Sequence, residues 1–230
     1  DNFSRREVID RLPGNTAVGH VRYSTTGETI LRNVQPLFAE LGSGGFALGH
    51  NGNLTNARTL RSRLIRDGAI FQSTSDTEVV LQLIARSKKS RIIERFIEAL
   101  RQVEGAYALT CLTNKKLIGA RDPLGIRPLM LGKLDDSYVL ASETCAFDII
   151  GAELLRDVQP GEMVSIGERG LEVRQLVESE RRAFCVFEHI YFARPDSRLG
   201  GQVLQVARGR MGEVLAREAP VDADLVIPVP

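Results

Sequence analysis

The stretch His50-Asn51-Gly52-Asn53-Leu54-Thr55-Asn56 follows the apolar run Phe46-Ala47-Leu48 and precedes a helical pattern. At such a junction, an Asn-Gly pair can direct a side-chain amide and a backbone N–H at one point. Two such donors form an oxyanion hole, which stabilises negative charge developing on a carbonyl oxygen. An Asn-Gly pair is more often a tight turn, so the motif alone is weak. Two companions strengthen it: Gly19-His20-Val21-Arg22-Tyr23-Ser24-Thr25-Thr26-Gly27 upstream and Thr74-Ser75-Asp76-Thr77-Glu78 downstream.

Composition restricts the class of protein. The 230 residues are 43% hydrophobic and 26% charged, which suits a globular protein with a sizeable core. The formal net charge of +1 gives no electrostatic case for nucleic-acid binding. No apolar segment approaches the ~20 residues of a membrane span, so we expect no membrane partner. The widely spaced cysteines argue against a disulfide framework and for a reducing, cytoplasmic setting.

Both ends of the sequence read as internal positions. Asp1 is not a starting methionine, and residues 224–230 predict a buried strand that stops where a loop should follow. We therefore expect the chain to be a piece of a longer protein.

The hydrophobic periodicity predicts an α+β fold with antiparallel sheets. Helices are expected from Thr55 to Gly68, from a capping box at Ser75 and Glu78, and over 90–102, 143–150 and 202–218. Strands are expected over 16–22, 45–49, 106–112, 116–121, 128–132, 138–142, 162–166, 171–176, 185–192 and 224–230. Two sheets sandwiched between helix layers would bury the apolar faces, and the charged residues 177–182 suggest a linker.

The three motifs together resemble the glutaminase domain of class II glutamine amidotransferases. The resemblance implies the N-terminal-nucleophile hydrolase fold, a four-layer α/β/β/α sandwich. Within that superfamily, residues 53–56, 121–129 and 187–197 are similar to the amidophosphoribosyltransferase family. The last of these stretches, Phe187-Glu188-His189-Ile190-Tyr191-Phe192-Ala193-Arg194-Pro195-Asp196-Ser197, is the most specific, because sister families do not share it.

This resemblance implies a reaction and a domain organisation. Glutamine, phosphoribosyl pyrophosphate and water would yield 5-phosphoribosylamine, pyrophosphate and glutamate, the first committed step of purine synthesis. Residues 1–182 would be a glutaminase domain without its N-terminal part. Residues 183–230 would open an α/β phosphoribosyltransferase domain, and the protein would be a homo-oligomer.

The resemblance also assigns roles in the glutamine site. The side-chain amide of Asn51 and the backbone N–H of Gly52 would form the oxyanion hole. Arg22 would hold the α-carboxylate of glutamine, Asp76 its α-amino group, and Thr25 would shape the pocket. The structural alternatives are a tight turn at Asn51 and Gly52, a surface ion pair for Arg22, and for Asp76 a favourable acid in the first helical turn.

The family's nucleophile is a thiol on the first residue, which would lie before Asp1. No cysteine of this chain fits that role, so we expect the isolated chain to lack glutaminase activity. Cys111 and Cys145 are interpreted as small buried hydrophobes. Cys185 stands where some family members have one of four cysteine ligands of a 4Fe–4S cluster, although cluster-free members can have cysteine there too. Mg²⁺ would accompany pyrophosphate at a site beyond Pro230.

The remaining polar motifs are interpreted as structural. His20 and His50 are expected to form structural hydrogen bonds. Arg121-Asp122-Pro123 and Arg127-Pro128 are expected to form an ion pair and a turn, and Glu143 is expected at an interface.

Two alternative functions stay open at this point. One is a different class II amidotransferase, such as a hexosamine or asparagine synthetase, against which the segment Tyr191–Ser197 argues. The other is a nucleophile-free regulatory or scaffold homologue.

Overall fold

The computed structural model describes residues 6–22, 30–178 and 181–227. By their contacts, the residues divide into two compact units, one of Asp1–Leu129 with Asp157–Phe184 and one of Met130–Arg156 with Cys185–Pro230. The expected domain boundary between residues 182 and 183 stays a prediction. Among the described residues, no helix is both long and apolar enough to cross a membrane.

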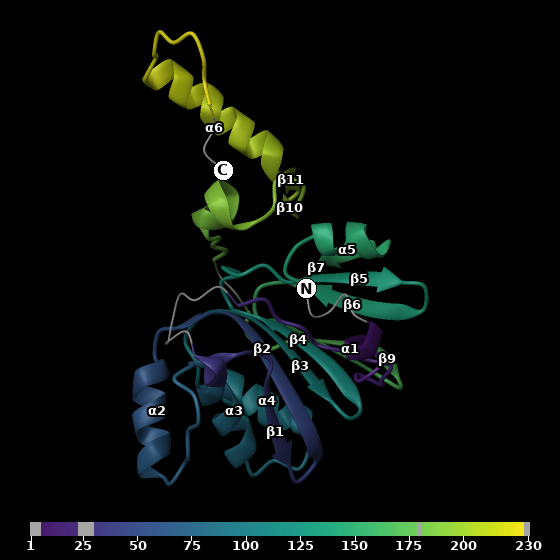
Figure 1. The fold of residues 1–230 in the computed structure, drawn as a ribbon. Coiled ribbons are helices and arrows are strands. Elements are labelled where there is room, and N and C mark those ends of the chain that lie inside the picture. The colour runs from purple at the N-terminus through teal and green to yellow at the C-terminus, as the bar shows by residue number, and fades with distance from the viewer. Residues whose placement is uncertain (1–5, 23–29, 179–180, 228–230) are drawn as a thin grey trace. The chain divides into compact units, whose positions relative to one another are not determined.

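A six-stranded antiparallel sheet forms the centre of the first unit (Figure 1). Its strand order is β1-β2-β3-β4-β8-β9. The pairs β1–β2, β3–β4 and β8–β9 are hairpins, whereas three helices lie between β2 and β3 and elements of the second unit lie between β4 and β8. The strands are β1 (Leu37–Leu41), β2 (Gly44–Leu54), β3 (Gly105–Thr113), β4 (Lys116–Arg121), β8 (Glu162–Gly167) and β9 (Gly170–Gln175).

Helices α3 (Thr77–Arg86) and α4 (Ile92–Leu100) lie against one face of this sheet, and α2 (Ala57–Arg66) contacts α3 (Figure 1). Their apolar stripes supply much of the core, as the periodicity predicted. The buried helix positions include Leu60, Leu64, Val79, Val80, Leu83, Ile84, Ile93, Phe96 and Leu100. Ile65, expected on the same stripe, is 52% exposed, because it lies beside that stripe rather than on it.

Three predicted strands are wrong. Residues 16–22 form no regular structure, and Val21 is 97% exposed. Residues 188–192, within the predicted strand 185–192, form the π-helical segment η3 (Glu188–Phe192). Residues 224–227 are exposed and extend no sheet, while 228–230 lie outside the described residues. An apolar run forms a strand only where a partner strand takes up its backbone N–H and C=O groups, and these runs have none among the described residues.

The second unit contains a three-stranded antiparallel sheet of order β6-β5-β7. Its strands are β5 (Met130–Leu134), β6 (Ser137–Ala141) and β7 (Glu153–Asp157), of which β7 was not expected. Helix α5 (Cys145–Ile150) packs closely on it, since a Cβ added at Gly132 would lie 2.6 Å from the ring of Phe147. The short pair β10 (Arg198–Leu199) and β11 (Gln202–Val203) leads into α6 (Leu204–Glu218).

Glu143 organises the second unit internally. Its carboxylate accepts hydrogen bonds from the backbone N–H of Arg194 (2.7 Å) and the hydroxyl of Ser197 (2.8 Å). Next to it, the hydroxyl of Thr144 accepts the backbone N–H of Arg198 at 2.8 Å. The residue expected at an interface thus joins the start of α5 to residues 194–198 of the same unit.

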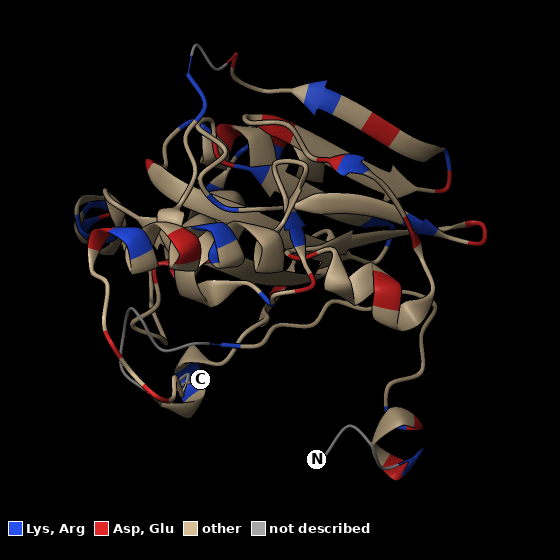
Figure 2. Ribbon diagram, turned by 90° about the horizontal axis from the view of Figure 1, so that it is seen from above, with Lys and Arg blue, Asp and Glu red and all other residues tan. Residues whose placement is uncertain are grey.

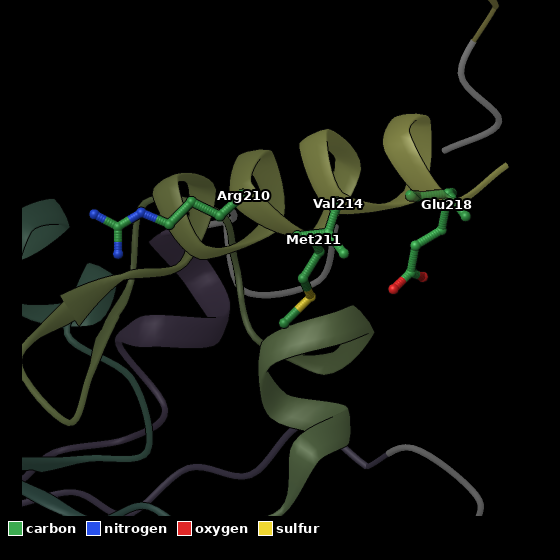
Figure 3. Close-up of a pocket in the computed structure, with 5 residues that line it drawn as sticks. Arg210, Met211, Val214 and Glu218 are labelled. Carbon is green, nitrogen blue, oxygen red and sulfur yellow. The ribbon is translucent and has the colours of Figure 1, made fainter. Parts of the chain in front are cut away.

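Helix α6 is joined to η3 by Arg208. The guanidinium of Arg208 donates to the carbonyl oxygens of His189 (2.6 Å) and Ala193 (2.7 Å). A hollow of about 370 Å³ runs along α6 between Arg210 and Glu218, with the side chain of Met211 extending from the helix (Figure 3). One helix supplies its whole lining, so the hollow is an uncovered helix face rather than a built site.

The loop after β4 is built around the buried carboxylate of Asp122, which is 0% exposed. This carboxylate accepts the backbone N–H groups of Leu124 (3.0 Å), Ile126 (3.1 Å) and Arg127 (3.0 Å). It also accepts the backbone N–H of Tyr107 on β3 at 3.3 Å. Asp122 therefore fixes both the shape of the loop and its attachment to the sheet.

Arg121 supports the same loop through carbonyl oxygens. Its guanidinium donates to the carbonyls of Gly125 (2.8 Å), Arg127 (2.8 Å) and Val158 (2.7 Å). The expected structural role of this motif is confirmed, but the hydrogen-bond partners of both charged groups are backbone groups rather than each other.

Replacing Asp122 with alanine should strongly destabilise the first unit. The substitution would leave several buried N–H donors without an acceptor, which costs on the order of 3–5 kcal/mol. Urea unfolding of Asp122→Ala against Glu168→Ala, an exposed carboxylate in the β8–β9 turn, measures this difference. Equal unfolding midpoints for the two variants would contradict the role assigned to Asp122.

Candidate functional site

The Asn51-Gly52 pair lies inside a strand. β2 continues through both residues to Leu54, and opposite them on β3 stand Ala108 and Tyr107. The alternative interpretation as a tight turn is therefore wrong. The Asn51 carboxamide forms no hydrogen bond within the described part of the chain, so it is available to a ligand.

Position 52 requires glycine. Its φ is +149°, and a Cβ added there would lie 2.1 Å from the carbonyl oxygen of Ala106 and 2.8 Å from Nε2 of His50. No side chain fits these distances, because real Cβ atoms essentially never approach backbone within 3.0 Å. The backbone at Gly52 is thus unshielded by a side chain of its own, which leaves its N–H open to approach.

Asp76 lies at the same end of β2. It is the N-cap residue of α3, and its Oδ2 accepts the backbone N–H of Leu54 at 2.9 Å. Its Oδ1 is 3.6 Å from Nδ1 of the buried His50. The hydrogen bond to Leu54 places the Asp76 carboxylate beside the strand end that carries Asn51 and Gly52.

The ionisation of Asp76 follows from these contacts. Burial by itself would raise the pKa of this carboxyl. The hydrogen bond and charge of His50, with the N–H groups of Leu54 and Thr77, outweigh burial and hold the pKa below its usual value. Asp76 is therefore an anion at neutral pH and can accept an ammonium group.

His50 is the structural hydrogen-bonding residue that the sequence predicted. Its Nδ1 is 3.3 Å from the hydroxyl of Thr77, and its backbone N–H donates to Oε1 of Gln35 at 2.7 Å. Nε2 is buried and has no hydrogen-bond partner among the residues that the structure describes. His50 thus connects β2 to the start of α3 and to the segment before β1.

The predicted capping box is wrong in its details. Helix α3 begins at Thr77, and the Ser75 hydroxyl accepts the backbone N–H of Thr77 at 3.2 Å. Glu78 reaches further back, where its carboxylate accepts the backbone N–H groups of Gln72 (2.8 Å) and Ser73 (2.7 Å). The carboxylate therefore fixes the loop before the helix rather than the helix N-cap.

Sequence reasoning missed a second brace at Asn33, which is fully buried. Its Nδ2 donates to the Thr74 hydroxyl (2.8 Å), and its Oδ1 accepts the Thr74 backbone N–H (2.9 Å). No local pattern marks Asn33, because its partner Thr74 lies 41 residues further along the chain.

The upstream motif is described only in part. His20 lies beside β2, since its Nδ1 would be 3.9 Å from a Cβ added at Gly49. Burial, together with the charges of His50 and Arg22, lowers the pKa of His20. The role of Arg22 in holding an α-carboxylate stays a prediction. Thr25 lies outside the described residues, and its role in shaping the pocket stays a prediction.

The three cysteines are free thiols. Burial raises the pKa of the Cys111 and Cys145 thiols, so both stay protonated at neutral pH and are poor nucleophiles. Among the described residues, no group of three or more His, Cys, Asp or Glu side chains could hold a metal ion. Cys185 alone does not make an iron–sulfur site.

The glutamine amidotransferase domain family matches residues 20–148, more than half of the chain. The chain belongs to this family. The match includes Arg22, Asn51, Gly52 and Asp76, so all four candidate residues that the structure describes in the first unit lie inside the family's domain.

Curated relatives of this amidotransferase chain are named amidophosphoribosyltransferase. The protein from Rhizobium etli is 53% identical over 100% of this chain and 47% of its own length. The protein from Archaeoglobus fulgidus is 46% identical over 97% of this chain and 50% of its own length. The chain thus spans about half the length of the curated relatives it matches.

Solved structures confirm the fold class. The glutamine phosphoribosylpyrophosphate amidotransferase from B. subtilis, solved with ADP and GMP, matches with a TM-score of 0.83 and 45% identity. The match covers 89% of this chain and 44% of that one. A second structure, described as the allosteric regulatory enzyme of purine biosynthesis, gives a TM-score of 0.84. The α+β fold of the N-terminal-nucleophile hydrolase type is therefore the fold of this amidotransferase chain.

Replacing Gly52 with alanine should destabilise the chain by more than about 3 kcal/mol, because the positive φ and the clash with Ala106 add. Gly42→Ala is the matched control, since a Cβ there meets nothing within 4 Å. Thermal unfolding of both variants measures the difference. A Gly52→Ala protein as stable as Gly42→Ala would refute the close approach.

The contribution of Asp76 to stability should depend on pH. Its folded pKa lies below the unfolded value of about 3.9, so the stabilisation is complete above that value and is lost as the pH falls through the folded pKa. The free energy of unfolding of the wild type relative to Asp76→Asn should therefore decrease as the pH falls from about 5 to about 2. Urea unfolding across this range tests it, and a difference that is flat with pH would show that the carboxylate's pKa is not depressed.

Proposed function

We propose that the longer protein to which this chain belongs is an amidophosphoribosyltransferase. It would convert glutamine, phosphoribosyl pyrophosphate and water into 5-phosphoribosylamine, pyrophosphate and glutamate. The names of relatives that are 53% and 46% identical along almost the whole chain support this proposal. This chain would provide the glutamine-binding part.

The observation that carries the proposal is the pairing of two opposite functions at one strand end. Asn51 and Gly52 offer hydrogen-bond donors for a developing oxyanion. Asp76 accepts the backbone N–H of Leu54, two residues after Gly52 on the same strand, and offers a carboxylate for an ammonium group. Glutamine requires this combination, because its side-chain amide and its α-ammonium group lie at opposite ends of the molecule. Arg22 would add the cation for the α-carboxylate, and Thr25 would line the pocket.

The chain's own residues would bind and polarise glutamine but not attack it. The amide of Asn51 and the N–H of Gly52 would stabilise the tetrahedral intermediate's oxygen as a thiol nucleophile adds to the amide carbon. That thiol would come from the first residue of the family's domain, since burial keeps Cys111 and Cys145 protonated. The isolated chain would therefore release no glutamate from glutamine.

Further properties of the longer protein follow from the resemblance. Mg²⁺ would neutralise the pyrophosphate at the phosphoribosyl site. Cys185, which is partly exposed, would be one of four cysteine ligands if the longer protein holds a 4Fe–4S cluster. The protein would work in the cytoplasm as a homo-oligomer.

In the longer protein, Asn51→Ala should lower glutamine-dependent formation of phosphoribosylamine about 10²- to 10³-fold, which is the usual effect of losing one oxyanion-hole donor. Activity with free ammonia should be retained, because ammonia bypasses the glutamine site. Coupled assays with each nitrogen donor measure the two rates. Asn15→Ala, at an exposed position, is the control.

Two results would contradict the proposal. Equal loss of both activities would indicate a folding defect rather than an oxyanion role. A wild-type protein without either activity would favour the nucleophile-free scaffold interpretation.

A further inference from the structure

The first unit contains a hollow at the opposite end of β2 from Asn51. It has a volume of about 500 Å³ and is lined by the β1–β2 turn, the β3–β4 turn, the β8–β9 hairpin and the start of α4. We call it the basic pocket, because five cationic side chains from three of these segments line it: Arg91, Lys115, Lys116, Arg169 and Arg174.

The acidic residues of the basic pocket do not balance these cations. Only Glu94 and Glu172 line it. The Glu172 carboxylate is shared among Arg169 (3.0 Å), Lys116 (3.6 Å) and Arg174 (3.9 Å). Five cations against two carboxylates leave the lining with an excess of three positive charges.

Two of the cations have no ionic partner. Among the described residues, neither Arg91 nor Lys115 forms an ion pair. Elsewhere the ribbon shows basic and acidic residues interspersed (Figure 2), in keeping with the net charge of +1. A local excess of three positive charges in a hollow is therefore a departure from the rest of the chain.

The remaining lining suits an anion with several oxygen atoms. No side chain caps α4, whose first residues Ile92 and Ile93 line the pocket, so the positive end of that helix adds to the field of the cations. The amide of Asn114 also lines it and packs closely over Gly44. Guanidinium groups and helix N-termini are the groups with which proteins hold phosphate oxygens.

We propose that the basic pocket binds an oligophosphate group, either inorganic or carried on a nucleotide. A single carboxylate would neutralise only part of the excess of three positive charges, whereas an oligophosphate carries enough negative charge to match it and has several oxygen atoms for Arg91, Lys115 and Arg169. The pocket shares no residue with the glutamine site, so this proposal does not depend on the proposed function.

Lysine acetylation of the full-length protein, read by mass spectrometry, tests the pocket directly. Tripolyphosphate should slow the modification of Lys115 about tenfold, while the exposed Lys88 and Lys89 outside the pocket keep their rates. ATP in place of tripolyphosphate distinguishes the two sources, since stronger protection by ATP assigns the nucleotide and weaker protection the inorganic ion. No protection, protection of all three lysines alike, or equal protection by citrate would overturn the proposal.

A pair of matched variants gives a second measurement. Lys115→Gln/Arg169→Gln should weaken tripolyphosphate binding at this site about tenfold in calorimetry. Lys88→Gln/Lys89→Gln removes the same charge elsewhere and should leave the affinity unchanged. Equal affinities of the two double variants would also overturn the proposal. Both pairs change exposed side chains, so folding is not expected to differ.

Discussion

The hydrogen bond from the backbone N–H of Leu54 to Asp76 is the contact on which the candidate site depends. It joins the end of a central strand to the beginning of a helix that lies 22 residues further along the chain. A carboxylate at that junction can hold two partners at once: one oxygen accepts the backbone N–H of Leu54, and the other lies 3.6 Å from Nδ1 of His50. The geometry of the candidate site thus comes from the same bond that positions the helix.

Other loops of the chain follow the same principle. Asp122, Glu78 and Glu143 are carboxylates whose main partners are backbone N–H groups of nearby loops. A buried loop must satisfy its backbone donors, and a carboxylate with two oxygens can accept several at once. The charged residues of these motifs therefore mostly hold loops in place, and Asp76 differs in that its second oxygen lies near a histidine, His50, rather than a backbone N–H group.

The sequence predicted what depends on local pattern. The apolar stripes of α3 and α4 and the strands β3, β4, β8 and β9 follow from periodicity alone. What it did not predict depends on distant partners. Val21 and the residues around Ile190 have the composition of strands, yet among the described residues no neighbouring strand forms hydrogen bonds with their backbone. β1 was missed although Leu37, Ala39 and Leu41 alternate with exposed Phe38 and Glu40, because the alternation covers only five residues.

The candidate site was predicted through its motifs, but not through its supports. The motifs named Asn51, Gly52 and Asp76, which the fold brings to one strand end. Asn33 and Gln35, which brace that end, carry no motif and become visible only when residues 15 to 41 positions apart meet. The local rule for capping boxes placed Glu78 on the wrong donor for the same reason, since Ser73 lies outside the pattern that the rule considers.

Because β2 runs without a break from Gly44 to Leu54, the number of residues before Asn51 decides which face of the sheet its side chain is on. Side chains alternate between the two faces of a strand, so Phe46, Leu48 and His50 share the buried face and Asn51 belongs to the other. Inserting or deleting a single residue between Gly44 and Asn51 would exchange the faces, turning the amide into the core and an apolar side chain toward the candidate site. Insertions or deletions between Gly44 and Asn51 therefore keep Asn51 on its face of the strand only if they change the length by an even number of residues. The turn at Gly42 and Ser43 lies before the strand and is not under this constraint.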